Sequence, residues 1–365
     1  CASLNKWGTL LAAGASSGEI IIWDFETRGI ARRLQSDDDG ASSPIVSVSW
    51  VPSGRCLLSC SDTGRIVQWD IMTRSVCVTA MLSSPILYGV QHPLDPIRCV
   101  VCIPATPPVL ASLSLPTASA PSPVPFPALP DRPTASGRCA LFAHHGRDIF
   151  IGWSLAAVTR HDPVSLSINA RLLLPGSSPI SMLALNRSST MLVVSSHDRI
   201  RLCDADSLHV MKEFVDVVNR TPFRVACISS NDDYIAAGAF KKNSPHSVYI
   251  WNRLDGALLV LLDGTNLGIV SLQWHTSMPV LVAVTTGEQI VTWSKNVNEN
   301  WSAFAPDFLE LHENVFVDDE TDRLSFTNMT NVNSDDPVDI MTMSDAILQE
   351  DDVFKYIPIS PRSIN

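Results

Sequence analysis

The chain has 365 residues, of which 45% are apolar and 17% are charged, and this apolar share excludes a chain that is disordered throughout. No apolar run approaches the roughly 20 residues that a membrane-spanning helix needs, so the sequence also argues against a helical membrane protein. The formal net charge is −11, but residues 296–365 alone hold 15 acidic and three basic residues, so the acidity belongs to the C-terminal part and the body is close to neutral.

One pattern recurs along the body: an apolar run, a turn rich in Gly, Ser and Asp, and β-branched residues that end in Trp-Asp or a variant. The first copy runs from Leu10 to Asp24 and the second from Cys56 to Asp70. The anchor position of this pattern falls near residues 23, 69, 112, 167, 203, 251 and 293, a mean spacing of 45. In the fourth copy, Trp153 is a weaker candidate for the anchor than Val164–Ser167.

The spacing matches the WD40 period of ~40–45 residues, in which four short strands form one propeller blade. We therefore predict an all-β fold, a seven-bladed WD40 β-propeller over residues 1–295, followed by an extended, largely disordered acidic tail over 296–365. Because the chain begins at Cys1 and not at methionine, we expect the strand that closes the ring to lie upstream.

Residues 104–136 interrupt the repeat with ten prolines and many Ala and Ser residues. Proline cannot donate a hydrogen bond to a sheet ladder. We therefore predict a disordered or polyproline-like insertion in the third blade, which replaces or displaces an outer strand. A Pro-rich ligand for another protein domain is the alternative interpretation.

The cysteines indicate core packing and not metal or redox chemistry. Cys99 and Cys102 form a lone CxxC pair within a strand-like run, and residues three apart on a strand point to opposite faces. Most of the nine cysteines lie in apolar runs, which is typical of reduced thiols in a cytosolic or nuclear protein. We predict no metal site.

Catalytic motifs lack their required context. Gly14–Gly18 matches G-x-S-x-G, but this motif needs strand–turn–helix and here stands in strand–turn–strand. His161-Asp162 and His197-Asp198 lie at predicted turns, where such pairs usually form local hydrogen bonds. We predict that the chain is not an enzyme, has no catalytic residues and needs no cofactor.

The tail holds short apolar islands in acidic surroundings. Asn300–Phe308 sets three aromatic residues around a proline, Pro337–Ile340 is a β-branched and acidic cluster, and Phe354–Ile359 is a third island. Isolated islands of this kind are typical of linear motifs that fold on binding. A strap that lies across the propeller is the alternative for the first of them.

The residues resemble those of the retinoblastoma-binding protein five family, the WD40 scaffold of MLL/COMPASS histone H3 lysine-4 methyltransferase complexes. The resemblance covers nearly the whole chain. It rests on these runs: Asn5–Ala12, Ile22–Phe25, Thr27–Ala31, Ser84–Leu87, Val218–Phe223 and Tyr249–Trp251. The most specific match is Glu299–Phe308 with Glu313–Val315, which a generic propeller has no reason to carry.

The resemblance implies a non-catalytic scaffold in the nucleus that stabilises the active conformation of a SET-domain methyltransferase and tethers other subunits. The implied SET-domain contacts are Asn300, Trp301, Phe304, Pro306, Asp307, Phe308, Glu313 and Asn314. An acidic box implied to bind a SPRY-domain subunit is matched, in shortened form, by Asp318, Asp319, Glu320, Asp322 and Phe326. The implied motif for a second WD40 subunit is Val338, Asp339 and Ile340.

The resemblance also implies that the propeller faces nucleosomal DNA. Phosphate binding requires clustered Lys and Arg, and the candidates in this chain are Arg220, Arg224, Lys241 and Lys242, with Arg220 as the strongest. Ordinary solvated surface charges are the alternative interpretation of these four residues.

Two other functions stay open at this point. A generic WD40 adaptor, such as a ubiquitin-ligase substrate receptor, would bind its ligand at the central mouth and would not need the tail. A propeller enzyme would need clustered carboxylates or metal ligands, for which the sequence gives no sign.

Overall fold

The computed structural model describes residues 1–35, 43–104, 107–113, 123–197, 199–216, 221–239, 246–265 and 268–294. The chain divides into two compact units, Cys1–Ser294 and Lys295–Asn365, and all the described residues belong to the first unit. The predicted acidic tail therefore lies outside the described residues. No described helix is long and apolar enough to cross a membrane.

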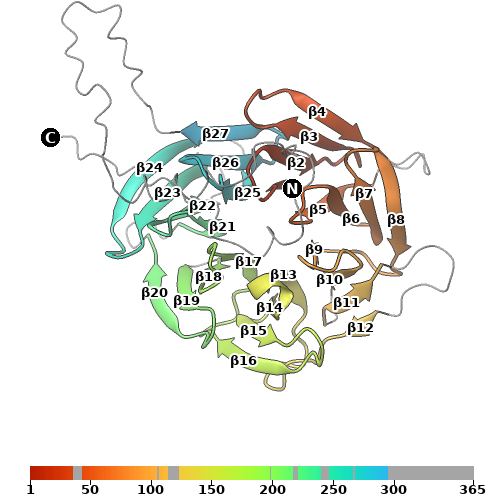
Figure 1. Cartoon of the computed structure of the whole chain (residues 1–365). Coiled ribbons are helices and arrows are strands. Elements are labelled where there is room, and N and C mark those ends of the chain that lie inside the picture. The colour runs from red at the N-terminus through yellow and green to blue at the C-terminus, as the bar shows by residue number, and fades with distance from the viewer. Residues whose placement is uncertain are drawn as a thin grey trace, which may run out of the picture. The chain divides into compact units, whose positions relative to one another are not determined.

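Seven antiparallel sheets of consecutive strands form a ring around a central axis (Figure 1). Blades one to three are β1 (Ala2–Leu4), β2 (Leu10–Gly14), β3 (Ile20–Asp24) and β4 (Ile30–Leu34); β5 (Ile45–Trp50), β6 (Cys56–Ser61), β7 (Arg65–Asp70) and β8 (Ser75–Met81); and β9 (Tyr88–Gln91), β10 (Arg98–Cys102), β11 (Val109–Ser112) and β12 (Val124–Pro125). Blades four and five are β13 (Gly137–Ala143), β14 (Asp148–Trp153), β15 (Ala157–His161) and β16 (Ile168–Leu173); and β17 (Ile180–Leu185), β18 (Met191–Ser196), β19 (Ile200–Asp204) and β20 (Val210–Phe214). Blade six is β21 (Phe223–Ile228), β22 (Tyr234–Ala239), β23 (His246–Asn252) and β24 (Leu258–Thr265), and blade seven is β25 (Ile269–Trp274), β26 (Val280–Thr285) and β27 (Ile290–Ser294).

The prediction of an all-β, seven-bladed propeller is confirmed. The one helical element among the described residues is a short 3₁₀ turn, His144–Gly146, between β13 and β14.

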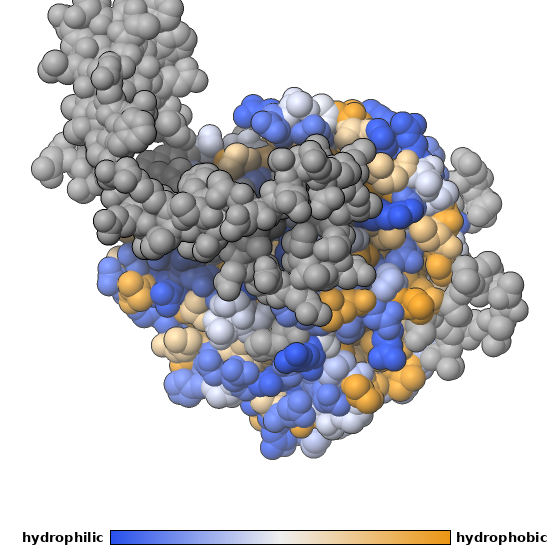
Figure 2. Space-filling model, in the orientation of Figure 1, coloured by the Kyte–Doolittle hydropathy of each residue, from blue (hydrophilic) through white to orange (hydrophobic). Residues whose placement is uncertain are grey.

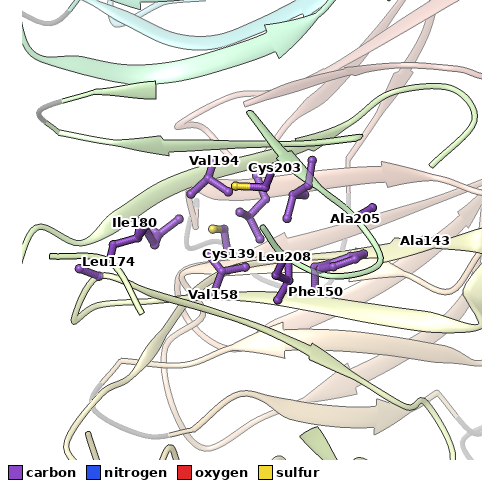
Figure 3. Close-up of a cluster of buried hydrophobic side chains, with 13 residues drawn as sticks. Cys139, Ala143, Phe150, Val158, Leu174, Ile180, Val194, Cys203, Ala205 and Leu208 are labelled. Atoms are coloured by element: carbon purple, nitrogen blue, oxygen red, sulfur yellow. The ribbon is translucent and has the colours of Figure 1, made fainter. Parts of the chain in front are cut away.

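Apolar side chains fill the spaces between neighbouring blades. Figure 3 shows the cluster between blades four and five, where Phe150 and Val158 of one sheet meet Ile180 and Val194 of the next. Each fully buried Val, Leu, Ile or Phe side chain contributes about 1.5–3 kcal/mol of folding free energy. Because neighbouring blades cover both faces of most sheets, the central strands carry continuous apolar runs and not an alternating pattern.

The anchor residues mark a bulge in the third strand of the blades. The pairing of third and fourth strands shifts register at Ile22/Trp23, Gln68/Trp69 and Ile250/Trp251. Blade four has the same shift at Arg160/His161. A bulge places one extra residue in one strand and re-aims its side chains, so His161 occupies the place that Trp occupies elsewhere.

The predicted anchors of blade four are therefore wrong. Val164–Ser167 lies in the turn between β15 and β16, and Trp153 ends β14, the second strand. His161 is fully buried and its neutral ring is held on both sides, with Thr159 Oγ1 at 2.8 Å from Nε2 and the Leu166 carbonyl at 3.0 Å from Nδ1. Trp153 donates its indole N–H to the same Thr159 hydroxyl at 2.7 Å. Trp153 and His161 are therefore joined through Thr159 in one buried hydrogen-bond network. Because a histidine takes the anchor position, the Trp-Asp pattern did not identify it.

The Pro-rich stretch does not simply interrupt blade three. Residues 114–122 lie outside the described residues, but Val124–Pro125 pairs with β11 as the outer strand of the blade. Phe126 and Leu129 are then almost fully buried, against Val100 and Trp153 among others. The expectation that the insertion replaces or displaces the outer strand is wrong, because the insertion itself supplies that strand and part of the core.

The cysteine and serine motifs are structural in this fold. Cys99 packs into the apolar cluster between blades two and three, and Cys102 packs into the cluster between blades three and four. Burial raises the pKa of both thiols well above the usual range, so they stay protonated. Gly14 ends β2 and the rest of the Gly14–Gly18 motif forms the turn to β3, which confirms the strand–turn–strand context.

Candidate functional site

All the contact residues predicted from the sequence except Arg224 lie outside the described residues, and Arg224 is exposed on β21. This holds for the SET-domain segment at 300–314, the acidic box at 318–326 and the motif at 338–340, and also for Arg220, Lys241 and Lys242. The structure does describe the strands that flank the three basic residues. It therefore defines the strand ends to which the segments with these residues are joined.

The strand ends next to the two segments with the basic residues lie at one edge of blade six. Residues 217–220 lie between β20 and β21, and residues 240–245 lie between β22 and β23. Phe223, the first residue of β21, pairs with Ala239, the last residue of β22, so both connections start at the same end of the sheet. The Phe223 N–H also donates to the His197 carbonyl at 3.2 Å, which brings the β18–β19 turn of blade five to this edge.

That turn contributes a described cation, Arg199, which the sequence reasoning missed. Arg199 Nη1 lies 2.8 Å from Glu213 Oε2, and Arg201 Nε lies 2.7 Å from Glu213 Oε1. Burial alone would raise the pKa of the Glu213 carboxyl, but the hydrogen bonds from both arginines outweigh it and hold the pKa below its usual value. Glu213 is therefore ionised and is bound by both guanidinium groups.

A hydroxyl clamp fixes both ends of the segment that contains Arg220. Tyr249 donates its O–H to Asp216 Oδ2 at 2.9 Å, and Thr221 donates its hydroxyl to the same oxygen at 3.0 Å. The two hydroxyls lie 3.2 Å apart, and both side chains are almost fully buried. Asp216 follows β20 of blade five and Thr221 precedes β21 of blade six, so the clamp fixes the two described ends on either side of residues 217–220.

Tyr249 of the clamp belongs to a group of buried aromatic rings. Tyr249 stacks on Trp251 with ring centroids 5.5 Å apart, and Phe223 packs edge-on against both. Phe214 closes the group 5.9 Å from Trp251. Each such aromatic pair is worth about 0.5–1.5 kcal/mol beyond its buried area. The basic edge of blade six therefore rests on a rigid base.

Exposed apolar side chains lie on the outer strands. Figure 2 shows apolar residues gathered on the rim at blades two and three, where Val76, Met81 and Val124 are exposed. In blade six, the four consecutive residues Leu258 to Leu261 of β24 are each about half exposed. A rim of this kind suits contacts with other proteins more than contacts with nucleic acid.

The described residues contain no group of three or more His, Cys, Asp or Glu that could hold a metal ion. Of the two predicted His-Asp turn pairs, Asp198 lies outside the described residues, and His161 is sealed from solvent. Asp162 accepts hydrogen bonds from the backbone and hydroxyl of Ser165, both at 2.7 Å. His161 and Asp162 thus form local hydrogen bonds, as predicted.

Comparisons with known proteins match stretches of this chain that range from about one blade to nearly its whole length. The WD domain, G-beta repeat family matches residues 33–70, from the end of β4 through β7. Retinoblastoma-binding-like protein E of Dictyostelium discoideum is 32% identical over 88% of this chain. The retinoblastoma-binding protein 5 homolog of Drosophila melanogaster is 28% identical over 98% of the chain, so the likeness runs past the propeller into the acidic segment. The chain is a homologue of proteins named for retinoblastoma-binding protein 5.

A fission yeast relative and a solved structure extend the comparison. The fission yeast protein named Set1 complex component swd1, of Schizosaccharomyces pombe, is 28% identical over 88% of the chain. The chain spans 65% of the Dictyostelium protein, 77% of the Drosophila protein and 82% of the fission yeast protein. The crystal structure of the Myceliophteria thermophila Cps50 (Swd1) β-propeller domain has a TM-score of 0.72 at 24% identity and covers 81% of this chain and 96% of that one, which supports the fold.

Proposed function

We propose that this chain is a non-catalytic scaffold subunit of a COMPASS-type histone H3 lysine-4 methyltransferase complex in the nucleus. The observation that carries the proposal is the likeness to a Set1 complex component and to retinoblastoma-binding protein 5 homologs over 88–98% of the chain. A likeness limited to one WD repeat would not support more than a generic adaptor.

The tail is the part that acts on partners in this proposal. Residues 300–314 bind the SET-domain methyltransferase, the acidic box at 318–326 binds the SPRY-domain subunit, and residues 338–340 bind a second WD40 subunit. A partner that binds only the ordered form of a flexible catalytic domain shifts the population toward that form. Several motifs on one chain also raise the effective concentration of each partner for the others, so weak contacts sum to a stable assembly.

The propeller is the platform and takes no part in the chemistry. Its buried His161 and Cys102 are used in local hydrogen bonds and in packing. Its blade-six edge suits a second task, contact with nucleosomal DNA through Arg220, Lys241 and Lys242. Arg199 beside this edge adds a further cation. Contacts of this type neutralise phosphates and carry no sequence information.

The Arg220→Ala variant is expected to weaken binding to nucleosomes at all DNA sequences, because one phosphate contact is lost. The slope of log affinity against log salt concentration should fall by about one. Electrophoretic mobility shifts at several salt concentrations measure both quantities. The Tyr249→Phe variant should change affinity in the same direction but less, because it removes only the hydroxyl that donates to Asp216.

Arg187→Ala is the matched control for this experiment. Arg187 is exposed in the β17–β18 turn, at the opposite end of blade five from the basic edge. Its loss should leave both the affinity and the salt slope unchanged. An Arg187→Ala effect as large as that of Arg220→Ala would mean that the propeller meets DNA through diffuse charge and not through this edge.

A further inference from the structure

One of the seven spaces between blades differs from the other six. Six apolar clusters of the described residues fill the spaces from blade one through blade seven in succession. No such cluster of described residues spans the seventh space, between blade seven and blade one, which we call the 7–1 seam. Burial of apolar surface is the main stabilising term in the other spaces, so the 7–1 seam depends on other contacts.

Polar side chains of blade seven hold the main chain of blade one across this seam. Gln273 accepts a hydrogen bond from the Leu4 N–H at 3.0 Å and donates one to the Ala2 carbonyl at 3.1 Å. Ser16 and Glu288 form a further hydrogen bond between the two blades. A hydrogen bond adds only about 0.5–1.5 kcal/mol of net stability. The buried Thr276 hydroxyl beside the seam has no hydrogen-bond partner among the described residues, which costs part of that gain.

Among the side chains at this seam, His275 is the most constrained, because both of its ring nitrogens take part in hydrogen bonds. Its Nδ1 accepts hydrogen bonds from the N–H groups of Ser277 at 3.2 Å and Met278 at 3.0 Å, so this nitrogen carries no proton. The Nε2–H therefore donates to the Gly8 carbonyl of blade one at 2.9 Å. The ring also packs against Phe25, with centroids 4.7 Å apart. Gly8 has a φ of +76°, and a Cβ there would lie 2.4 Å from His275 Nε2, so the close approach requires glycine.

His92 makes the same kind of contact at another seam and serves as an internal comparison. It also follows the first strand of its blade, and its Nδ1 accepts from the N–H groups of Leu94 and Asp95. Its ring lies against Gly146 of the next blade, where a Cβ would lie 2.3 Å from Nε2. The space between blades three and four is, however, filled by an apolar cluster that includes Phe126 and Trp153. Loss of the His92 contact would leave that seam packed.

We propose that the 7–1 seam is the opening point of the propeller ring and that neutral His275 is an acid-sensitive latch across it. A proton on Nδ1 would remove the acceptor for Ser277 and Met278 and place a charge in a buried site. Burial lowers the pKa of His275 and the bond to Gly8 partly offsets it. The charged residues on the elements that pack against the ring are Lys6 on the turn with Gly8, Asp24 and Glu26 on the turn with Phe25, and Asp232 and Asp233 on the turn whose Ser230 binds the His275 carbonyl.

The direction of the pH effect follows from the lowered pKa of His275 in the closed seam. Above a pH of about 6.5, the ordinary histidine value, both the closed and the open seam hold neutral His275 and the latch is intact. As the pH falls through that value, the open seam takes up a proton and the closed seam resists, so opening becomes more favourable. At pH 5.5 this linkage favours opening by up to about tenfold for one histidine.

Hydrogen exchange of the full chain at pH 7.5 and 5.5, corrected for the intrinsic rate, tests the proposal. Peptides from Ala2–Gly14 and Ile269–Thr285 report on the 7–1 seam, and peptides from Gly137–Ala143 and Ile180–Leu185 report on the seam between blades four and five. The expected result is exchange about tenfold faster at pH 5.5 in the first pair and a much smaller change in the second. An equal response at both seams would overturn the proposal.

Variants separate His275 from the other histidines. Asn186 occupies the equivalent position in blade five, where its Oδ1 accepts the Met191 N–H and its Nδ2 donates to Asp232 of blade six. His275→Asn should therefore keep the seam closed and abolish its acid response, with His275→Gln as a second variant if the first does not fold. His92→Asn should leave the acid response of the 7–1 seam unchanged. An acid response that survives in both His275 variants contradicts the latch.

Discussion

Replacement of Phe304 and Phe308 together by alanine is expected to remove most of the stimulation that the chain gives to a SET-domain methyltransferase. Buried aromatic anchors dominate interface energetics, and truncation of one commonly costs about 2 kcal/mol or more, roughly thirtyfold in affinity. Both residues belong to the Glu299–Phe308 run that is the most specific match to the family. The rate of methyl transfer to histone H3 lysine 4 in a reconstituted complex is the measurement.

The matched control is Phe354→Ala. Phe354 lies in the same acidic segment but in an island with no assigned partner. It should leave the rate unchanged, and the thermal unfolding of the propeller should be the same in all three proteins, since both sites lie beyond Ser294. Unchanged stimulation by the double variant would remove the aromatic run from the mechanism.

The Trp251→Ala variant is expected to cause the largest loss of stability. Trp251 is buried on β23 and contacts Tyr249, Phe223 and Phe214. Its truncation leaves a cavity between blades five and six, and Trp→Ala substitutions in cores cost about 3–5 kcal/mol. Denaturation by urea, followed by far-ultraviolet circular dichroism, measures the change in the free energy of unfolding.

Leu254→Ala provides the contrast. Leu254 lies in the β23–β24 turn of the same blade and is 66% exposed, so its truncation should stay within about 0.5 kcal/mol. The Trp251→Ala protein should also bind nucleosomes more weakly, because the clamp of Tyr249 on Asp216 loses its base. A loss of stability below about 1.5 kcal/mol for Trp251→Ala, well under the usual cost of such truncations, would contradict the rigid base assigned to this edge.

The sequence allowed the blades to be predicted where the Trp anchor is present. Trp23, Trp69, Trp251 and Trp293 all lie in the third strand of their blades, as the repeat indicates. The anchor of blade four was not identified from the repeat, because His161 and not Trp occupies the anchor position. Two signals were present in the sequence: His161 is followed by Asp162, as Trp is in the first two blades, and it ends a β-branched run.

Composition misled the prediction for the Pro-rich stretch. Ten prolines argue against strands, yet Pro125 lies on an outer strand, where a missing N–H does not break the ladder of the blade. Phe126 and Leu129, the large apolar residues in this part of the stretch, are the ones that become buried. Apolar residues within a Pro-rich stretch were therefore a better guide to its structure than the prolines.

The charged residues of the candidate site stay predictions, because Arg220, Lys241 and Lys242 lie outside the described residues. Arg220 stands out as a cation within a specific run, but the clamp that fixes its segment depends on Tyr249, 28 residues from Thr221 in the chain. The 7–1 seam joins Gln273 and His275 to the first residues of the chain, 267 to 271 positions away. Contacts of this range arise from ring closure, and no local pattern in one sequence reports them.

Deletion of residues 296–365 tests the central claim most directly. The full chain and the deleted chain are each added to a SET-domain methyltransferase with its other subunits, and methyl transfer to histone H3 lysine 4 is measured. Full stimulation by the complete chain, with none from a folded propeller that lacks the tail, is the predicted result. Equal stimulation by both proteins, or methyl transfer by the complete chain alone, would contradict it.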